Sequence, residues 1–396
     1  MNIVVSFTSY PPRISTVHRV VESLYQQTMP ADEIILYLSL DEFPEMESDL
    51  PDTLNRLNGQ KGFRIEWVQG NLKSHKKYYY ALQNYKDAVV ITVDDDTVYA
   101  KTMISELVES HKRFPDAVSA RRVRMIIKNS EGLEPYGKWE GETYLDEYAD
   151  IPRMDLCAVG IGGILYPVFN RDHWSDKKMI FEMAEEQDDL WLKYNEIIDH
   201  IPIVYTKSSQ EDITIEDSQI DRLSFNNLYG NGNDKCMYEL CVLLKEQDEK
   251  GYREWFQKLM TWDEYLIEKK KYYSSIYNTM FDKFGDMPVY VYGAGIMAQY
   301  ILMILEDLGL TQRIAGIIVS DKLANPSELY NLQIKELSEI DQNMTLGIIL
   351  GVRSENRKEV RDILQGYNCQ YIELDLRIIA RYYPIKWRYY KMMLLK

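Results

Sequence analysis

Residues 1–125 alternate short apolar runs with segments of helical periodicity, and this alternation most limits the possible folds. The run NIVVSFT (2–8) has the composition of a buried strand, and apolar residues recur at helical spacing in ISTVHRVVESLYQQ (14–27). Further strands are predicted at EIILYLS (33–39), RIEWVQ (64–69) and AVVITVD (88–94). Strands that alternate with helices form crossover units, so the sequence predicts a mainly parallel sheet with ligands at the carboxyl ends of its strands.

The patterns change further along the chain. At 232–284 the pattern is helical, and a second strand–helix alternation begins at VYVYGAGIMAQY (289–300). A chain of 396 residues with 45% hydrophobic content is expected to form two or three compact units. We predict an α/β fold of four parts: an A-type domain with a mainly parallel sheet flanked by helices (1–231), a helical connector (232–284), a small Rossmann-like domain (285–376) and a basic aromatic tail (377–396).

Charge and cysteine content exclude some classes of function. The chain has 62 acidic and 46 basic residues, for a net charge of -16, which disfavours binding to the phosphate backbone of nucleic acid. Its four cysteines lack metal-ligand spacing and suit a reducing compartment. The opening MNIVVSFTSY has no basic region followed by a long apolar segment, and no apolar run reaches about 18 residues. We therefore expect a cytoplasmic location.

Three consecutive aspartates, Asp94, Asp95 and Asp96, follow a strand of buried type. Adjacent carboxylates repel one another, so a fold keeps them together only where water or a cation offsets that cost. In an extended chain Asp94 and Asp96 would converge while Asp95 points elsewhere. Their hard oxygens suit Mg²⁺ or Mn²⁺ bound to a diphosphate. The alternative is a solvated strand end, or a cap in which Asp96 and Thr97 begin the helix at 100–114.

Basic and glycine-rich motifs lie on either side of this acidic run. In LKSHKKYYYAL (72–82), Lys76 and Lys77 either neutralise a leaving diphosphate or form a solvated basic face. The three arginines of ARRVRM (120–125) present the same alternatives, and at least one of them should face solvent. The glycines of GIGGILYP (160–167) permit close approach of the backbone to a ligand, or simply a turn.

These motifs occur in one order with SFTSYPPR (6–13) and EEQDDLWL (185–192). Over residues 1–235 the sequence thereby resembles glycosyltransferases of the A-type fold, especially family-2-like enzymes of bacterial surface-polysaccharide synthesis. The resemblance implies a nucleotide-sugar donor, preferably a UDP-sugar, together with Mn²⁺ or Mg²⁺. It also implies a saccharide or polyprenyl-linked acceptor, and NNLYGNGND (226–234) is either an acceptor loop or an ordinary exit from the domain.

The resemblance assigns the metal to Asp94 and Asp96, with Asp96 preferred. No third protein ligand stands out, although His200 is a candidate. The nucleoside is expected where the strands 2–8 and 33–39 end, unless Pro11 and Pro12 of SFTSYPPR serve only to make a stiff turn. The expected contacts with the nucleotide sugar are Thr8, Arg13, Asp41, Lys76, Lys77, Asp94, Asp95, Gly162 and Gly163.

Asp188 and Asp189 are the candidate catalytic residues. Sugar transfer with inversion requires a carboxylate that removes the proton of the acceptor hydroxyl. In the enzymes that the sequence resembles, an apolar residue follows this base three positions later. Leu192 follows Asp189 by three, so the resemblance favours Asp189. The alternative is an acidic first helical turn that the helix dipole stabilises.

A second glycine motif, Gly293, Gly295 and Ala298, lies between a predicted strand and helix. Such G-x-G-x-x-A turns place a phosphate at a helix N-terminus, so Gly293 and Gly295 are candidate nucleotide contacts. Asp321 resembles the acid that binds ribose, but it follows Gly293 by 28 positions rather than by about 20. We expect a structural or regulatory use of this domain in preference to redox chemistry.

The last 20 residues, RIIARYYPIKWRYYKMMLLK, hold six Lys or Arg and no acid, with aromatic residues between them. This composition suits an anionic membrane interface on the inner face of the cell membrane, or a terminal helix docked on the acidic body. The predicted function is metal-dependent sugar transfer in capsule or other surface-polysaccharide synthesis. The alternative is a catalytically inactive nucleotide-binding scaffold or sensor.

Overall fold

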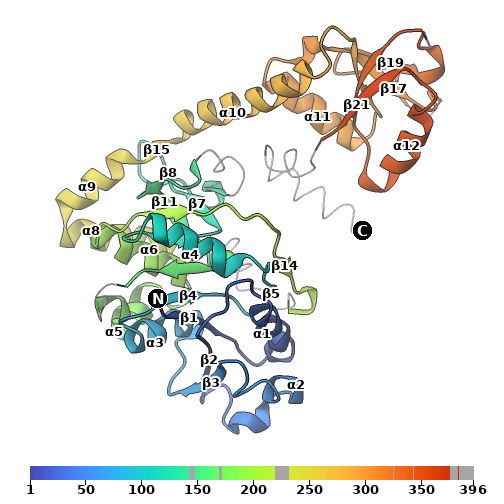
Figure 1. Cartoon of the computed structure of the whole chain (residues 1–396). Coiled ribbons are helices and arrows are strands. Elements are labelled where there is room, and N and C mark those ends of the chain that lie inside the picture. Colours follow the sequence, from blue (N-terminus) through green and yellow to red (C-terminus); the bar gives the residue numbers. More distant parts are fainter. Residues whose placement is uncertain are drawn as a thin grey trace. The chain divides into compact units, whose positions relative to one another are not determined.

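The computed structural model describes residues 1–141, 148–168, 172–218, 232–323, 325–341, 343–374 and 382 (Figure 1). By internal contacts the chain divides into two compact units, Met1–Tyr265 and Leu266–Lys396. Apart from Tyr382, the predicted tail lies outside the described residues, as does the part of the candidate acceptor loop at 226–231.

An eight-stranded sheet organises the first unit. Strand β1 lies between β2 and β4 and is parallel to both, and β2 is parallel to β3. Strand β12 is antiparallel to both β4 and β6. In spatial order the strands are β10 (Pro152–Arg153), β13 (Ile203–Tyr205), β6 (Val118–Ala120), β12 (Ile164–Tyr166), β4 (Val89–Thr92), β1 (Ile3–Thr8), β2 (Glu33–Ser39) and β3 (Phe63–Val68). The predicted mainly parallel sheet flanked by helices is confirmed.

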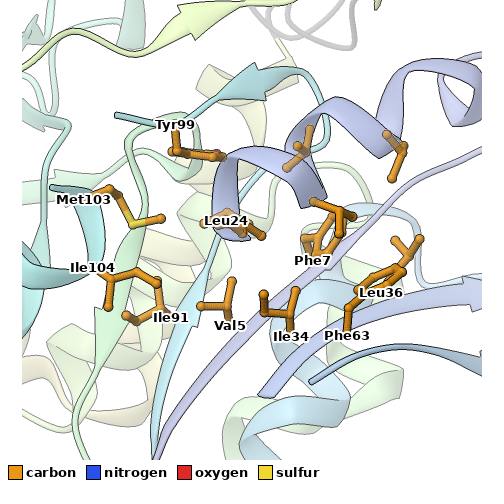
Figure 2. Packing of buried hydrophobic residues seen from close by; sticks show 14 of the residues in the cluster. Val5, Phe7, Leu24, Ile34, Leu36, Phe63, Ile91, Tyr99, Met103 and Ile104 are labelled. Atoms are coloured by element: carbon orange, nitrogen blue, oxygen red, sulfur yellow. The ribbon is translucent and has the colours of Figure 1, made fainter. Parts of the chain in front are cut away.

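Both faces of this sheet are covered, which explains why its strands are almost continuously apolar. Val5 and Phe7 of β1 face a core that includes Leu24 of α1 (Val17–Tyr25) and Ile104 of α4 (Met103–Arg113) (Figure 2). The preceding residue, Val4, faces the opposite side and packs in a cluster with residues of α3 (Lys76–Asn84). This alternation fixes the register of β1, so polar side chains at its carboxyl end have a defined place.

Shorter elements complete the first unit. Its remaining strands are β5 (Thr97–Val98), β7 (Val123–Met125), β8 (Ile127–Lys128), β9 (Glu140–Gly141), β11 (Leu156–Ala158), β14 (Ile213–Thr214) and β15 (Met260–Thr261). Its remaining α-helices are α2 (Asp52–Asn55), α5 (Lys177–Met183), α6 (Asp188–Ile198), α8 (Gly232–Gln247) and α9 (Glu249–Lys258), and α10 (Trp262–Asp282) continues into the second unit. The segment predicted to be a helical connector is therefore helical.

The second unit contains a six-stranded sheet. Its order is β18 (Glu328–Leu329), β19 (Leu332–Glu336), β17 (Ile314–Val319), β16 (Val289–Tyr292), β20 (Leu346–Leu350) and β21 (Cys369–Glu373). All pairs are parallel except β18 with β19. Helices α11 (Ile296–Asp307) and α12 (Arg357–Leu364) complete the predicted second α/β domain.

Two expectations from composition can be compared with the structure. None of the helices in the described ranges has the length and apolar character needed to cross a membrane. Cys157, Cys236 and Cys241 are buried free thiols, as expected for small apolar residues, whereas Cys369 is half-buried.

Candidate active site

The three aspartates form a turn at the carboxyl end of β4, in the middle of the main sheet. The backbone N–H of Asp94 donates to the Tyr99 hydroxyl at 2.8 Å, and the Asp96 carbonyl accepts from the N–H of Ile215 at 2.8 Å. Because β4 already ends at Thr92, strand alternation does not extend to the aspartates, although Asp94 and Asp96 still lie close enough that, after the larger effect of burial, Asp96 acts to raise the pKa of Asp94. The expected helix cap is wrong, since α4 begins at Met103.

Asp95 and Asp96 share a cation instead. Arg13 Nη1 lies 2.8 Å from Asp95 Oδ1 and 3.2 Å from Asp96 Oδ2. Ser9 Oγ also donates to Asp95 Oδ2, at 2.5 Å. Burial alone would lower the pKa of Arg13, but Asp95 and Asp96 raise it, so the guanidinium remains charged. Arg13 was predicted to lie at this site, whereas Ser9 was not.

Lys77 joins the acidic turn to helix α6. Its Nζ lies 2.8 Å from Asp94 Oδ1 and 2.7 Å from Asp188 Oδ2, and its side chain is only 6% exposed. Burial alone would lower the pKa of Lys77, but Asp188, Asp94 and Asp189 raise it well above its usual value. A buried cation bonded to two carboxylates is not a solvated basic face, so that alternative is wrong for Lys77.

Lys76 is also buried, in a different group of polar side chains. Its Nζ forms an ion pair with Glu42 and donates to Asn71 Oδ1 at 3.2 Å. Burial lowers its pKa, against the opposing effect of Glu42. The two lysines of the predicted basic motif therefore lie at the ends of different strands, and neither lies on a solvated face.

Helix α3 is bonded to the segment before α6 by His75. This buried imidazole makes contacts of 2.7 Å from Nε2 to the Ala184 carbonyl and 2.8 Å from Nδ1 to the Tyr78 hydroxyl. Burial lowers the pKa of His75, so the ring is neutral. Since a carbonyl can only accept, Nε2 carries the proton and Nδ1 accepts from Tyr78. Lys73 adds ion pairs to Glu185 and Glu186, at 3.0 and 2.9 Å.

Asp188 and Asp189 begin α6, and their environments move their pKa values in opposite directions. Burial acts to raise the pKa of Asp188, but Lys77 outweighs it and holds that pKa below its usual value. For Asp189, burial and repulsion by Asp188 raise the pKa well above its usual value. Its Oδ1 is buried without a hydrogen-bond partner in the described part of the chain. The pKa values of these adjacent carboxyl groups are thus moved apart, an arrangement typical of acid–base sites.

The glycine loop approaches this group of charges at Gly160, the first glycine of the GIGGILYP motif. A Cβ atom on Gly160 would lie 2.7 Å from Lys77 Nζ and 2.9 Å from Asp94 Oδ1, closer than such atoms normally pack. The predicted Gly162 instead packs against Arg122, and Gly163 (φ 85°) packs against Met103. The absence of a side chain at Gly160 therefore leaves room for the ion pair.

The predicted nucleoside contacts lie at the ends of adjacent strands. Thr8 Oγ1 donates to the Tyr37 carbonyl at 2.7 Å, between β1 and β2. Asp41 follows β2 in a turn where its backbone N–H donates to Ser39 Oγ at 3.1 Å. Its exposed side chain is accessible to a ligand. Their contact with a nucleoside stays a prediction.

The carboxylate oxygens of Asp94 and Asp96 fit a hard divalent cation, but they would need further ligands to complete its coordination. Among the residues that the structure describes, no three His, Cys, Asp or Glu side chains are grouped closely enough to hold a metal ion. Mg²⁺ and Mn²⁺ commonly use one or two carboxylates and complete their coordination with substrate phosphates. Candidate His200 follows the opposite end of α6, an 11-residue helix of about 16 Å, so it cannot join the acids at the helix start.

The second glycine motif has the geometry of a tight turn. Gly293 has φ 104°, and Gly295 precedes α11 as its N-cap. A Cβ atom on Gly293 would lie 3.0 Å from the Gly351 carbonyl, so packing alone accounts for this glycine. Asp321 Oδ1 accepts from the backbone N–H of Leu323 at 2.8 Å and thus stabilises its own turn. Nucleotide contact by Gly293 and Gly295 remains a prediction.

Of the three arginines after β6, Arg121 is buried, whereas Arg122 and Arg124 are half-buried. Arg124 Nη1 donates to the Trp139 carbonyl at 3.0 Å, and its guanidinium lies over the Tyr136 ring. Arg121 is buried among acidic side chains. Sequence reasoning also missed Tyr99, whose only local signal is its place five residues after Asp94.

Replacing Asp189 with asparagine should stabilise the protein at neutral pH in the absence of ligands. Ionisation of Asp189 is disfavoured in the folded state, so its cost to folding grows as the pH rises above the unfolded-state pKa of about 4. The gain in melting temperature of Asp189→Asn over the parent should therefore be absent near pH 4 and increase toward pH 7. Thermal unfolding in buffers without metal or nucleotide measures it.

Asp188→Asn is the matched control for this prediction. Its lowered pKa contributes stability above the unfolded-state pKa, and the substitution leaves buried Lys77 with one carboxylate fewer. It should lower the melting temperature at pH 7. A melting temperature for Asp189→Asn at or below that of the parent at pH 7 would contradict the electrostatic account.

Residues 3–158 match the model of the glycosyl transferase family 2 domain. A comparison with curated proteins returned no match. Similar solved structures include Staphylococcus aureus TarS 1–349 in complex with UDP, with 15% identity, coverage of 52% of this chain and 59% of that chain, and a TM-score of 0.31.

Two further structures are similar at lower identity. Glucosyl-3-phosphoglycerate synthase from Mycobacterium tuberculosis, in complex with Mn²⁺, UDP-glucose and phosphoglyceric acid, has 11% identity, 61% and 80% coverage, and a TM-score of 0.36. The mannosyltransferase PcManGT from Pyrobaculum calidifontis, in complex with GDP-Man and Mn²⁺, has 10% identity, 52% and 55% coverage, and a TM-score of 0.29. At these values we transfer no residue role from them.

The family match covers the acidic turn, Arg13, Lys77 and strands β1 to β4 of the main sheet, and it ends before Asp188. The ion pair of Lys77 with Asp188 connects the matched region to α6. Residues 3–158 therefore match the glycosyl transferase family 2 domain, and this matched region contains the acidic turn with Arg13 and Lys77.

Proposed function

We propose that this protein transfers a sugar from a nucleoside diphosphate sugar, with a UDP-sugar as the preferred donor, to a saccharide or polyprenyl-linked acceptor. The observation that carries the proposal is the position of Lys77 between Asp94 and Asp188. The buried ammonium group of Lys77 thereby contacts one carboxylate at the end of a strand and another at the start of α6. A role in capsule or other surface-polysaccharide synthesis is part of the same proposal.

The donor diphosphate would be held by cations of the chain and by a divalent ion. Arg13 and Lys77 are charged at neutral pH and lie beside the carboxylates that would face the donor. Asp94 and Asp96 would hold Mn²⁺ or Mg²⁺ together with phosphate oxygens. The ion supplies charge neutralisation for the diphosphate as it leaves. With the donor bound, the Lys77 ammonium group would donate to a phosphate oxygen in place of one of its carboxylate partners.

Asp189 would accept the proton of the acceptor hydroxyl. In the proposed step the acceptor oxygen forms a bond to the anomeric carbon, the bond from that carbon to the diphosphate breaks, and the nucleoside diphosphate leaves with the bonding electron pair. The hydroxyl proton passes to the Asp189 carboxylate. A raised pKa makes Asp189 a stronger base than an exposed aspartate once it is ionised. Attack opposite to the leaving group gives inversion of configuration.

Two further parts of the proposal concern location and the second unit. We place the protein in the cytoplasm, and the composition of residues 377–396 supports attachment to the inner face of the cell membrane, where a lipid-linked acceptor would be found. For the Rossmann-like unit we propose a structural or regulatory role, because the described parts of its sheet and helices supply none of the charged groups invoked above.

Asp96→Ala and Asp94→Ala should each abolish metal-dependent release of UDP from a UDP-sugar. Each variant removes a carboxylate that would hold the ion, so a loss of about 100-fold or more is expected, with the fold retained. The measurement is UDP release with Mn²⁺ or Mg²⁺, in parallel with circular dichroism. The control is Asp116→Ala, because Asp116 is an exposed acidic residue outside the acidic turn.

Near-parental activity in both variants would reject the metal assignment. If the parent neither binds nor hydrolyses UDP-, GDP- or CDP-sugars with either ion, the activity proposal itself is rejected. Binding without any turnover on a range of saccharide acceptors would instead favour an inactive nucleotide-binding scaffold.

Asp189→Asn should lower the transfer rate by about 100-fold or more while donor affinity stays unchanged, because the amide cannot accept the proton. Transfer kinetics and calorimetric titration of the donor separate the two effects. Retention of the anomeric configuration in the product would exclude the base role. If Asp188→Asn alone reproduces the loss, the base role belongs to Asp188 and not to Asp189.

A further inference from the structure

A segment that we call the strap, residues 206–215, runs from the end of β13 to the acidic turn. At its start the N–H of Thr206 donates to the Ala120 carbonyl at 2.8 Å, and at its end the N–H of Ile215 donates to the Asp96 carbonyl at 2.8 Å. Between these points β14 pairs antiparallel with β5, the two-residue strand that directly follows the aspartates. The strap is therefore part of what holds the acidic turn in place.

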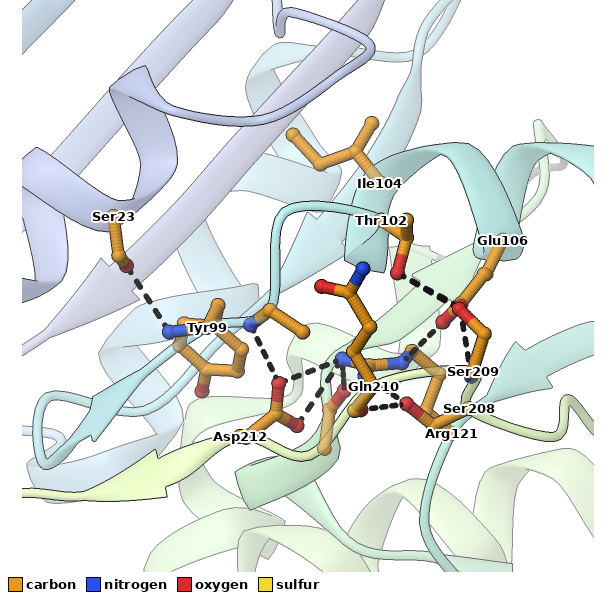
Figure 3. A network of polar contacts seen from close by, with 12 residues as sticks. Ser23, Tyr99, Thr102, Ile104, Glu106, Arg121, Ser208, Ser209, Gln210 and Asp212 are labelled. Atoms are coloured by element: carbon orange, nitrogen blue, oxygen red, sulfur yellow. Dashed lines mark hydrogen bonds and ion pairs between the residues drawn. The ribbon is translucent and has the colours of Figure 1, made fainter.

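The guanidinium of Arg121 lies at the centre of a polar network that holds this strap (Figure 3). Its side chain is 1% exposed, and Arg121 itself follows β6. Its partners lie on three parts of the unit, namely α4, the glycine loop and the strap. They are Glu106 Oε2 (2.9 Å), the Gly162 carbonyl (3.3 Å), Asp212 Oδ1 and Oδ2 (3.1 Å each), Ser208 Oγ, and the Gln210 carbonyl (3.3 Å).

The two carboxylates of this network are bonded beyond Arg121. Asp212 Oδ1 accepts from the backbone N–H of Ala100 at 2.8 Å, so it joins the strap to the chain that leaves β5. Glu106 Oε1 accepts from Thr102 Oγ1 at 2.8 Å and from the backbone N–H of Ser209 at 2.9 Å. The strap is thus bonded through the side chains of Asp212 and Glu106 to the chain that follows the acidic turn.

The chemistry of this network requires arginine. Glu106 and Asp212 are both largely buried, at 13% and 20% exposure of their side chains, so loss of the shared cation leaves two carboxylates close together without compensation. A lysine supplies charge from one atom and cannot reach carboxylates and carbonyls in several directions at once. Burial already raises the pKa of Asp212, against the opposing effect of Arg121.

We propose that Arg121 is a positioning residue for the donor site: it fixes the strap against β5 and so holds Asp96 in the place where it would bind the metal–diphosphate group. The inference rests on the proposed function. In the described contacts Arg121 reaches none of the three aspartates, so its effect passes through Asp212, β14 and the bond from Ile215 to Asp96.

The test uses the full-length chain with Arg121→Lys, which keeps the charge, and Asp212→Asn, which keeps the shape and an acceptor for Ala100. Arg121→Met is included, although it leaves buried carboxylates and can fail to fold. Arg113→Met is the matched control, because Arg113 is an arginine of α4 whose ion pair with Asp150 is exposed. Each variant is compared with the parent in melting temperature, in amide hydrogen exchange and in calorimetric UDP affinity with and without Mn²⁺.

In folded Arg121→Lys and Asp212→Asn, exchange at the Ile215 amide should accelerate about tenfold or more. The gain in UDP affinity that Mn²⁺ confers should fall about tenfold, as for other residues that support metal ligands indirectly. UDP affinity without Mn²⁺ should not change, and Arg113→Met should match the parent in every measurement. A purely structural role would lower the melting temperature without this selective loss of the Mn²⁺ effect.

Parental exchange at Ile215 and a parental Mn²⁺ effect in both folded variants would overturn the inference. If Mn²⁺ has no effect on UDP binding by the parent, the proposed metal-dependent function fails instead. In that case exchange at Ile215 still decides whether Arg121 holds the strap.

Discussion

The candidate active site depends on one buried ion-pair arrangement, the ammonium group of Lys77 between Asp94 and Asp188. These carboxylates come from different parts of the fold, the end of β4 and the start of α6, and their side chains are 28% and 12% exposed. Without a shared cation they would repel each other across the site. The Ser6 hydroxyl, which donates to the Lys77 carbonyl at 2.5 Å, fixes the origin of that side chain.

The same arrangement explains why adjacent acids on α6 differ. Lys77 bonds Asp188 and helps to lower its pKa against the effect of burial, whereas burial and the repulsion of Asp188 raise the pKa of Asp189 despite the opposing effect of Lys77. Ionising Asp189 therefore costs folding free energy in the resting protein, a cost that sites which use charge commonly carry. Gly160 is part of the same arrangement, because a side chain at this position would displace the Lys77 ammonium group. Stability and reactivity are thus set by the same few contacts.

The sequence predicted the parts of this site that depend on local pattern. Alternating apolar runs indicated the parallel sheet, and strand-end polarity indicated the aspartates, whereas Arg13 was expected, as a nucleoside contact, from the resemblance alone. The sequence could not predict that Asp95 and Asp96 share the Arg13 cation, because this contact depends on the residue at which β4 ends. Arg121 and Asp212 lie 91 positions apart in the chain, so no local spacing reveals their contact. The same holds for Lys77 and Asp188, which only the docking of α3 against the segment before α6 brings together.

The most direct test of the account is calorimetric titration of UDP and of uridine into the parent and a Lys77→Gln variant, with Mn²⁺ present. Lys86→Gln, at an exposed ion pair, serves as the control. If Lys77 faces the diphosphate, UDP affinity should fall about tenfold or more in Lys77→Gln, as for loss of one charge-assisted hydrogen bond. Uridine affinity should be unchanged. Equal UDP affinity in the parent and in a folded Lys77→Gln variant would contradict the account.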